Sequence, residues 1–265
     1  MAAPPIEPAT LAAPDHWRAI DFISDLHLTA ATPSTVALWS DYLHQTQADA
    51  VFILGDLFEV WVGDDARSEG FEARGAEILR SAAALRPIWF MVGNRDFLLG
   101  SAMLEACHVA PLEDPTLLRA FGAEALLTHG DALCLADVPY QQFRRVVRDP
   151  AWQRDFLQRP LGERRALARA MRAESERHKA AQDPGAWVDV DSEAALSAMR
   201  SAGAAMMIHG HTHRPGSEEL EPGFWRHVLS DWDVDDAIVP RAQVLRWRRE
   251  GLGRLTPHEA MTATR

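Results

Sequence analysis

Five short clusters of the chain carry residue types that bind metal ions and activate water. The side chains that could act as ligands are Asp25, His27, Asp56, Asn94, His129, His211 and His213. Seven mixed oxygen and nitrogen donors suit two divalent cations that share one carboxylate, and this donor mixture favours Mn²⁺-like metals. Neither Cys107 nor Cys134 lies in such a cluster, so a thiolate zinc site is not expected. The sequence therefore predicts a site that holds two cations and performs metal-assisted hydrolysis.

Each cluster alone has an ordinary structural explanation. Asp25-x-His27 could be a turn with a surface histidine, and Gly55-Asp56 is common turn chemistry. Three histidines within residues 209–213 are rarer outside metal sites and affinity tags. All the clusters follow short apolar runs of one chain. Their joint occurrence favours one metal site over several unrelated turns.

Short apolar runs that end at the polar clusters indicate the elements that position the ligands. We expect buried strands at residues 20–23, 51–54, 88–92, 125–127 and 204–208, with two more at 225–229 and 242–247. Residues 35–47 and 70–84 are typical of helices. The fold class is therefore α/β (α+β), with its chemistry at strand ends. Because residues i and i+2 of a strand point the same way, Asp25 with His27 could present two ligands to one side, as could His211 with His213.

The domain organisation follows from changes in composition along the chain. Residues 1–19 are rich in Ala and Pro and are expected to be a disordered extension, and residues 251–265 a tail. The domain at 20–250 contains a segment, 137–200, that has few strand signals and many good helix formers. We expect this segment to be a helical insertion.

Composition restricts where the protein works and what it binds. The first 20 residues lack the basic start and apolar core of a secretory signal, and no apolar run approaches the roughly 20 residues that span a bilayer. Two cysteines without a disulfide framework agree with a reducing, cytoplasmic location. The net charge of -11 argues against a nucleic-acid partner. Residues 141–180 are an exception, because they carry eleven Lys/Arg against five Asp/Glu, a local +6.

The five clusters resemble the signature blocks of the calcineurin-like metallophosphoesterases over about residues 20–250. Around these clusters the chain contains the longer motifs SDLHL, ILGDLFEVWVGDD, GNRDFLLG, THGDALC and IHGHTHRP. These motifs resemble one branch of that family more closely, the branch that cleaves the pyrophosphate of a UDP-linked diacylated glucosamine in lipid A biosynthesis. The resemblance implies two β-sheets packed face to face, helices on their outer sides, and a helical cap over the site.

The resemblance also implies a role for individual residues. One cation would bind Asp25, His27 and His213, the other Asn94, His129 and His211, with Asp56 between them. The catalytic residues would be Asp56, Asn94, Arg95 and His211. The substrate would contact Asn94, Arg95, Asp137, Tyr140, Arg172, Ser175, Lys179 and His211. Lys179 and Gln182 depart from the family, which often has Asn and Lys at these positions, so the cap contacts of this chain differ in part.

Arg95 supports a diphosphate substrate on chemical grounds. Many phosphomonoesterases of this family have histidine at this position, where it can protonate an alkoxide leaving group. Cleavage of a pyrophosphate expels a phosphate monoester, whose second pKa near 6 makes it a good leaving group without an acid. An arginine that binds phosphate oxygens bidentately is more useful there. The products that the resemblance implies are UMP and 2,3-diacylglucosamine 1-phosphate.

The basic segment at 141–180 could bind an anionic lipid nucleotide and loosely attach the protein to an anionic membrane. Apolar residues that could meet the acyl chains are Phe143, Val146, Val147, Phe156, Leu157 and Met171. The segment could instead be a solvated helical face packed on the core. The expected place of work is the cytoplasmic face of the inner membrane, with peripheral attachment.

Two other functions remain open from the sequence. A metallophosphoesterase that acts on nucleotides or phosphoproteins would need no apolar cavity under the insertion. A non-enzymatic binding protein on the same fold would be expected to have lost metal ligands, whereas this chain has the full set.

Overall fold

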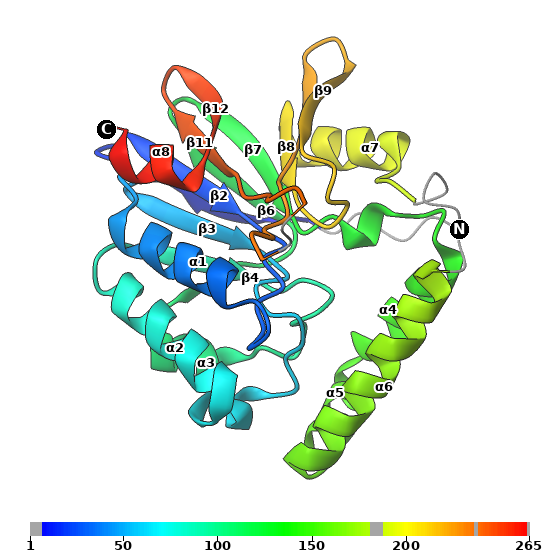
Figure 1. Cartoon of the computed structure of the whole chain (residues 1–265). Coiled ribbons are helices and arrows are strands. Elements are labelled where there is room, and N and C mark those ends of the chain that lie inside the picture. The colour runs from blue at the N-terminus through cyan, green and yellow to red at the C-terminus, as the bar shows by residue number, and fades with distance from the viewer. Residues whose placement is uncertain (1–6, 181–187, 236–237, 264–265) are drawn as a thin grey trace.

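Two six-stranded sheets form the centre of the protein, and helices lie on their outer sides (Figure 1). The computed structural model describes residues 7–180, 188–235 and 238–263, without the side chains of residues 174–176 and 178–180. In spatial order, the first sheet contains β1 (Ala9–Ala12), β6 (Thr116–Ala120), β7 (Ala123–Thr128), β8 (Met206–His209), β10 (Phe224–Val228) and β9 (Gly216–Glu221). The second contains β12 (Gly251–Leu255), β11 (Val244–Arg248), β2 (Ala19–Ile23), β3 (Ala50–Leu54), β4 (Ile88–Met91) and β5 (Ala110–Pro111). The predicted architecture of two packed sheets is confirmed.

Alternation along the central strands determines which side chains lie between the sheets. Phe52 of β3 belongs to the cluster that joins the two sheets, together with Ile20 and Phe22 of β2. Val51 and Ile53 point the other way and pack under the helices. Because both faces of these strands are covered, their sequence is a continuous apolar run rather than a polar and apolar alternation.

The helices belong to two groups. The body contains α1 (Pro33–Gln45), α2 (Gly70–Ala83), α3 (Ser101–Cys107), α7 (Ser192–Ala202) and α8 (Pro257–Thr262). The other group is α4 (Val138–Val147), α5 (Pro150–Leu157) and α6 (Leu161–Ala180), which project together beside the body in Figure 1. We call α4–α6 the helical insertion. No helix in the described part of the chain is both long enough and apolar enough to span a membrane.

The structure corrects three boundaries that were predicted from the sequence. Residues 9–12 are not disordered, because they form β1 and pair in parallel with β6. Residues 251–262 are not a tail, because β12 pairs with β11 and α8 follows it. The insertion ends before α7, whose Leu196 and Met199 are buried with Met207 of β8. The partner of β1 is distant in sequence, whereas β12 forms a hairpin with β11 and α7 directly precedes β8.

Ion pairs attach the helical insertion to the body. The Arg164 guanidinium is almost fully buried, and its Nη1 lies 2.9 Å from Oδ1 of Asp65. Arg165 of the same helix pairs with Glu69 and Glu72. Carboxylates of the body therefore neutralise part of the basic charge of the insertion, which the sequence had suggested for binding a lipid substrate or a membrane.

Candidate metal centre

All seven predicted metal ligands lie just beyond the carboxyl ends of five strands. β2, β3 and β4 are parallel neighbours in one sheet, and β7 and β8 are parallel neighbours in the other. The carboxyl ends of parallel neighbours meet at the same edge, so segments that are distant in the chain converge there. The structure thus brings together residues that span positions 25 to 213.

The backbone at the ligands is unusual and corrects one prediction. Asp25 and His27 follow β2, and His211 and His213 follow β8, so neither pair is placed by strand alternation. These four residues and Asp56 have positive φ angles of 48° to 69°. Such left-handed conformations cost roughly 1–3 kcal/mol each for residues other than glycine and persist where the surrounding structure enforces them. Tight left-handed turns, rather than extended strands, aim these side chains.

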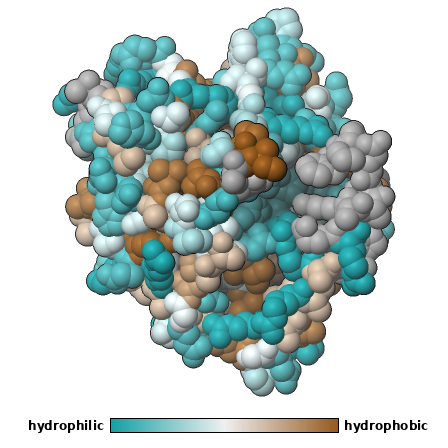
Figure 2. Space-filling view, in the orientation of Figure 1, coloured by the Kyte–Doolittle hydropathy of each residue, from teal (hydrophilic) through white to brown (hydrophobic). Residues whose placement is uncertain are grey.

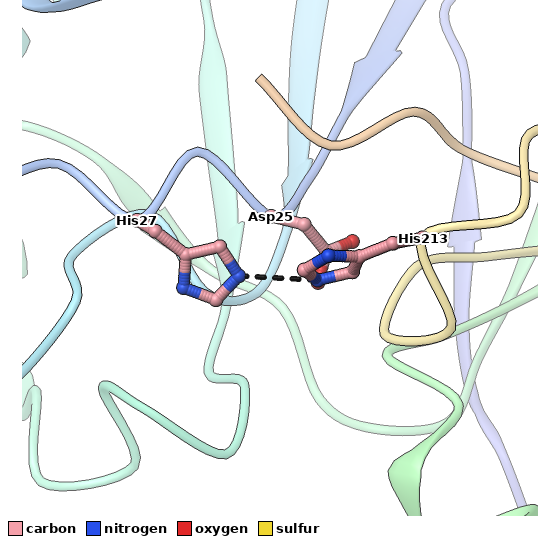
Figure 3. Close-up of side chains that lie close together, drawn as sticks. All are labelled: Asp25, His27 and His213. Carbon is pink, nitrogen blue, oxygen red and sulfur yellow. Dashed lines mark hydrogen bonds and ion pairs between the residues drawn. The ribbon is translucent and has the colours of Figure 1, made fainter. Parts of the chain in front are cut away.

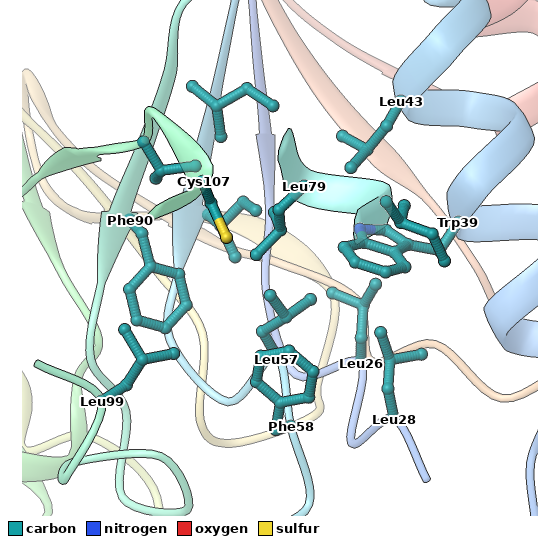
Figure 4. Close-up of a cluster of buried hydrophobic side chains, with 14 of the residues drawn as sticks. Leu26, Leu28, Trp39, Leu43, Leu57, Phe58, Leu79, Phe90, Leu99 and Cys107 are labelled. Atoms are coloured by element: carbon teal, nitrogen blue, oxygen red, sulfur yellow. The ribbon is translucent and has the colours of Figure 1, made fainter. Parts of the chain in front are cut away.

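Buried neighbours enforce those turns. Leu26 and Leu28 flank His27 and lie in the hydrophobic cluster between the second sheet and its helices, as does Leu57 next to Asp56 (Figure 4). The backbone N–H of His27 also donates to the carbonyl of Asp56 at 3.0 Å. Burial of alternate leucines therefore holds the intervening polar side chains on the opposite side, toward the site.

Glycine is required where the loops approach the ligand carboxylates. A Cβ atom on Gly93 would overlap the side chain and backbone of Asp56, and one on Gly210 would overlap Asp25 and Ser24. These contacts explain why a glycine precedes the predicted ligands Asn94 and His211.

One half of the site consists of Asp25, His27 and His213. Potential ligand atoms of these three lie within 4.8 Å of one another. Nε2 of His27 is 3.2 Å from Nε2 of His213, as the dashed line in Figure 3 marks, and Nε2 of His213 is 3.4 Å from Oδ1 of Asp25. Burial opposes ionisation of Asp25, but the hydrogen bond and charge of His213 hold the pKa of that carboxyl well below its usual range.

The other half consists of Asn94, His129 and His211. Nδ1 of His129 lies 2.9 Å from the Leu54 carbonyl, which can only accept, so Nδ1 carries the proton. Nε2 of His129 faces Oδ1 of Asn94 at 3.0 Å. Nδ1 of His211 approaches the same oxygen at 2.8 Å. Two imidazoles and one amide oxygen therefore converge, and this donor set fits a divalent cation.

Asp56 lies between the two halves. Its Oδ2 is 3.9 Å from Nε2 of His27, and its Oδ1 is 3.7 Å from Nε2 of His129. Asp25, Asp56 and His129 form a second group of potential ligands within 4.8 Å. Asp25 is common to both groups, whereas Asp56 turns one oxygen toward each half. This arrangement suits a carboxylate shared by two cations.

The electrostatics of the second half also favour cations. Burial lowers the pKa of His129, but the carboxylates of Asp56, Asp25 and Asp131 outweigh it and raise this pKa to about 9. Burial and the charge of His129 lower the pKa of His211 to about 4. The site therefore attracts positive charge and keeps His211 neutral, as a metal ligand must be.

Two acidic residues near the ligands were not assigned a role from the sequence. Asp96 is fully buried and accepts the backbone N–H groups of Gly93 at 2.7 Å and Leu57 at 2.8 Å, so it joins the loops that follow β3 and β4. Burial and the charge of Asp56 raise the pKa of Asp96 to about 6. Glu59 lies 3.1 Å from Nδ1 of His27. Glu59 and Asp96 belong to the same sequence motifs as Asp56 and Asn94, and this was the signal in the sequence that could have identified them.

Arg95 lies at the edge of the ligand cluster. Its backbone N–H donates to Oδ1 of Asp56 at 2.8 Å, which places it directly beside the carboxylate between the two halves. Its side-chain Nε is buried and has no hydrogen-bond partner among the described residues. A buried guanidinium N–H without an acceptor fits an anionic ligand.

The residues of the helical insertion that were predicted to contact substrate have different neighbours in the structure. The Tyr140 ring lies 5.8 Å from that of His211, and its hydroxyl donates to Asp131 at 2.5 Å. Asp137 caps α4 by accepting the N–H of Tyr140. Arg172 pairs with Glu59. The side chains of Ser175 and Lys179 lie outside the described part of the chain, and so does Gln182.

Apolar residues of the insertion divide into buried and exposed sets. Val147 and Phe156 are 3% and 6% exposed, so they stabilise the insertion and are unavailable to an acyl chain. The exposed members of the predicted set are Phe143, Val146, Leu157 and Met171. In the space-filling view, brown residues line the lower part of the hollow between the body and the insertion (Figure 2).

The chain is similar to known proteins over most of its length. A family model described as calcineurin-like phosphoesterase matches residues 19–215. A UDP-2,3-diacylglucosamine hydrolase from Chromobacterium violaceum is 45% identical over 81% of this chain and 90% of its own length. Proteins of the same name from Ralstonia nicotianae and Stenotrophomonas maltophilia are 44% and 38% identical, over 85% and 88% of this chain and 87% and 98% of their own lengths. From the extent of these matches, the chain belongs to the calcineurin-like phosphoesterase family.

Proposed function

We propose that this protein is a metal-dependent hydrolase that cleaves the pyrophosphate bond of UDP-2,3-diacylglucosamine to give UMP and 2,3-diacylglucosamine 1-phosphate. The observation that carries the proposal is the convergence of seven oxygen and nitrogen donors from five strand ends. The substrate is suggested by relatives that carry the name UDP-2,3-diacylglucosamine hydrolase. The proposed role is a step of lipid A biosynthesis.

Seven residues would hold two divalent cations in the arrangement expected from the sequence. Asp25, His27 and His213 would bind one, Asn94, His129 and His211 the other, and Asp56 would bind both. Imidazole, carboxylate and amide donors without thiolate favour Mn²⁺. Two such cations supply a water that is activated at neutral pH and neutralise charge on the phosphoryl group.

Arg95 would bind the oxygens of the attacked phosphoryl group. Its backbone is fixed by Asp56, and its buried Nε needs an acceptor. Asn94 and His211, which contact each other at 2.8 Å, would orient the same group. The leaving phosphate monoester needs no proton donor, so the absence of a histidine at position 95 fits a diphosphate better than an alkyl phosphate.

The helical insertion would bind the rest of the substrate. Tyr140 and Arg172 lie on the side of the insertion that faces the metal centre, where they contact Asp131 and Glu59 of the body. Asp137, Ser175 and Lys179 would complete the polar contacts, and the exposed apolar residues of α4–α6 would accommodate the acyl chains. We propose that exposed basic residues of the insertion attach the protein peripherally to the cytoplasmic face of the inner membrane.

Product analysis in ¹⁸O-labelled water tests this function. The full chain is incubated with UDP-2,3-diacylglucosamine and Mn²⁺, and the products are analysed by mass spectrometry. We expect UMP and the lipid monophosphate, with the label in UMP, because water should attack the phosphorus attached to uridine. Label in the lipid phosphate would reverse the assigned orientation of the substrate. Absence of UMP, together with turnover of a simple nucleotide phosphodiester, would favour a different phosphoesterase of this family.

A further inference from the structure

Glu59 connects the metal centre to the helical insertion. One carboxylate oxygen, Oε2, lies 3.1 Å from Nδ1 of His27, and the other, Oε1, pairs with Nε of Arg172 on α6. The Glu59 side chain is 19% exposed, so solvent screens both contacts only in part. A single carboxylate thus contacts a candidate metal ligand on one side and the insertion on the other.

The backbone fixes Glu59 beside His27. The N–H of Glu59 donates to the carbonyl of Leu28 at 3.3 Å, and Leu28 forms an isolated bridge with Phe58. The loops that follow β2 and β3 are therefore joined at these residues. Because Leu28 and Phe58 are also buried, the position of Glu59 relative to His27 does not depend on a flexible side chain alone.

This contact selects one tautomer of His27. Nδ1 of His27 is buried and forms no well-aligned hydrogen bond with a described residue, so its polar contact is the Glu59 carboxylate at 3.1 Å. A carboxylate beside Nδ1 favours a proton on that nitrogen and leaves the lone pair on Nε2. Nε2 is the atom that faces His213 and Asp56. The tautomer that Glu59 favours is therefore the one that can bind a cation in the site.

The contact with Arg172 lies on the side of α6 that faces the body. Arg164, eight residues earlier and about two turns away, pairs with Asp65. Among the described residues, the Arg164–Asp65 pair contacts none of the ligand histidines, whereas Glu59 of the Arg172–Glu59 pair contacts His27. These two ion pairs provide a matched comparison, because both attach α6 and only one involves the metal centre.

We propose that Glu59 is a positioning residue that holds His27 ready for metal binding and aligns Arg172 of the insertion with the metal centre. The inference rests on the metal centre of the proposed function. The test of this inference measures metal affinity and not hydrolysis. The inference can therefore fail while the hydrolytic function stands, and the proposed substrate can be wrong while the inference stands.

The test uses the full chain after metal removal, titrated with Mn²⁺ by calorimetry and by electron paramagnetic resonance. In Glu59→Gln, an amide can present either a donor or an acceptor to Nδ1 and no longer selects the tautomer. We expect one of two Mn²⁺ sites to weaken by about 10- to 100-fold, the usual loss when the hydrogen-bond partner of a ligating histidine is removed. The other site should stay within twofold of wild type, and the spectrum should change from coupled to isolated Mn²⁺ at low occupancy.

Two control variants separate tautomer selection from attachment of the insertion. Asp65→Asn loosens α6 at Arg164 and should leave both Mn²⁺ affinities within twofold of wild type. Arg172→Gln should raise amide hydrogen exchange in α6 while changing Mn²⁺ affinity less than Glu59→Gln does. Equal loss of Mn²⁺ affinity in Asp65→Asn and Glu59→Gln would overturn the proposal, because general loosening would then explain both.

Wild-type Mn²⁺ affinities in a folded Glu59→Gln would also overturn it. If that variant does not fold, nitrogen NMR of the wild-type protein loaded with Zn²⁺ decides instead. A protonated Nδ1 on His27 would support the proposal, and coordination of the metal through Nδ1 would contradict it.

Discussion

Nε2 of His27 lies 3.2 Å from Nε2 of His213, although 186 positions separate the two residues in the chain (Figure 3). Two neutral imidazoles in this arrangement need a proton on one of the facing nitrogens, whereas a cation can use the lone pairs of both. Each nitrogen is also near a carboxylate, that of Asp56 or Asp25. The pair thus has the composition of a metal-binding half-site.

We expect chelation to abolish hydrolysis and Mn²⁺ to restore it better than Zn²⁺ or Mg²⁺, because the donors are imidazole, carboxylate and amide without thiolate. Mn²⁺ should also raise the unfolding temperature of the chelated protein, since a ligand at 100 times its Kd stabilises the folded state by about 2.7 kcal/mol per site. Activity assays and thermal melts with each metal measure both effects. Full turnover in chelator would contradict the metal centre.

Asp56→Ala should be the most damaging substitution among the ligands, because Asp56 faces both halves of the site. We expect it to lose both cations, whereas His213→Ala should retain one. Elemental analysis of the purified variants gives the metal content, and Asp41→Ala on the exposed surface of α1 provides a control that should keep both. Two cations at full occupancy in Asp56→Ala would refute the shared carboxylate.

Arg95→Ala should lower kcat on the diphosphate by about 10² to 10³, a typical loss for a residue that stabilises developing charge. Metal content should stay normal, because Arg95 contributes only its backbone N–H to Asp56. Arg249→Ala in the exposed turn between β11 and β12 is the matched control and should keep wild-type kcat.

Arg95→His should not restore cleavage of the diphosphate, because imidazole lacks the bidentate fork of guanidinium. It should instead raise the weak hydrolysis of an alkyl phosphomonoester, whose leaving group benefits from a proton donor. Wild-type cleavage of the diphosphate by Arg95→Ala would make Arg95 structural and remove the chemical argument for a pyrophosphate substrate.

The stability of the metal-free protein should fall in mild acid through His227. Burial, and to a lesser extent the charge of Arg254, lower the pKa of His227 to about 4 in the folded state, against 6.5 in the unfolded chain. The unfolded state then binds more protons between pH 6.5 and pH 4, so this stability is present above pH 6.5 and is lost as pH falls. At pH 5 the loss is about 2 kcal/mol relative to pH 7.5.

Urea unfolding of wild type and His227→Gln at pH 7.5 and pH 5, both in chelator, isolates this contribution. The glutamine variant should lose about 2 kcal/mol less than wild type between the two pH values. An equal loss in both proteins would show that His227 is not the titrating group.

Local sequence was sufficient to predict the strands and to name the polar residues that the structure brings together at their ends. Apolar runs such as residues 51–54 indicate a buried strand by themselves, and Asp56 follows directly. The role of Arg95 rests on residue type and stays a prediction. The strand predictions succeed because hydrophobic patterning is a property of a few consecutive residues.

The tertiary structure decided what depends on contacts between distant segments. Residues 9–12 have no strand signal of their own and become β1 because β6 offers them a parallel edge. The left-handed backbone at Asp25 and His27 follows from burial of Leu26 and Leu28, which extended-strand geometry did not predict. The two contacts of Glu59 join loops after β2 and β3 to α6, more than a hundred positions further along the chain. Sequence patterns report local preference, whereas these arrangements exist only once packing has brought the segments together.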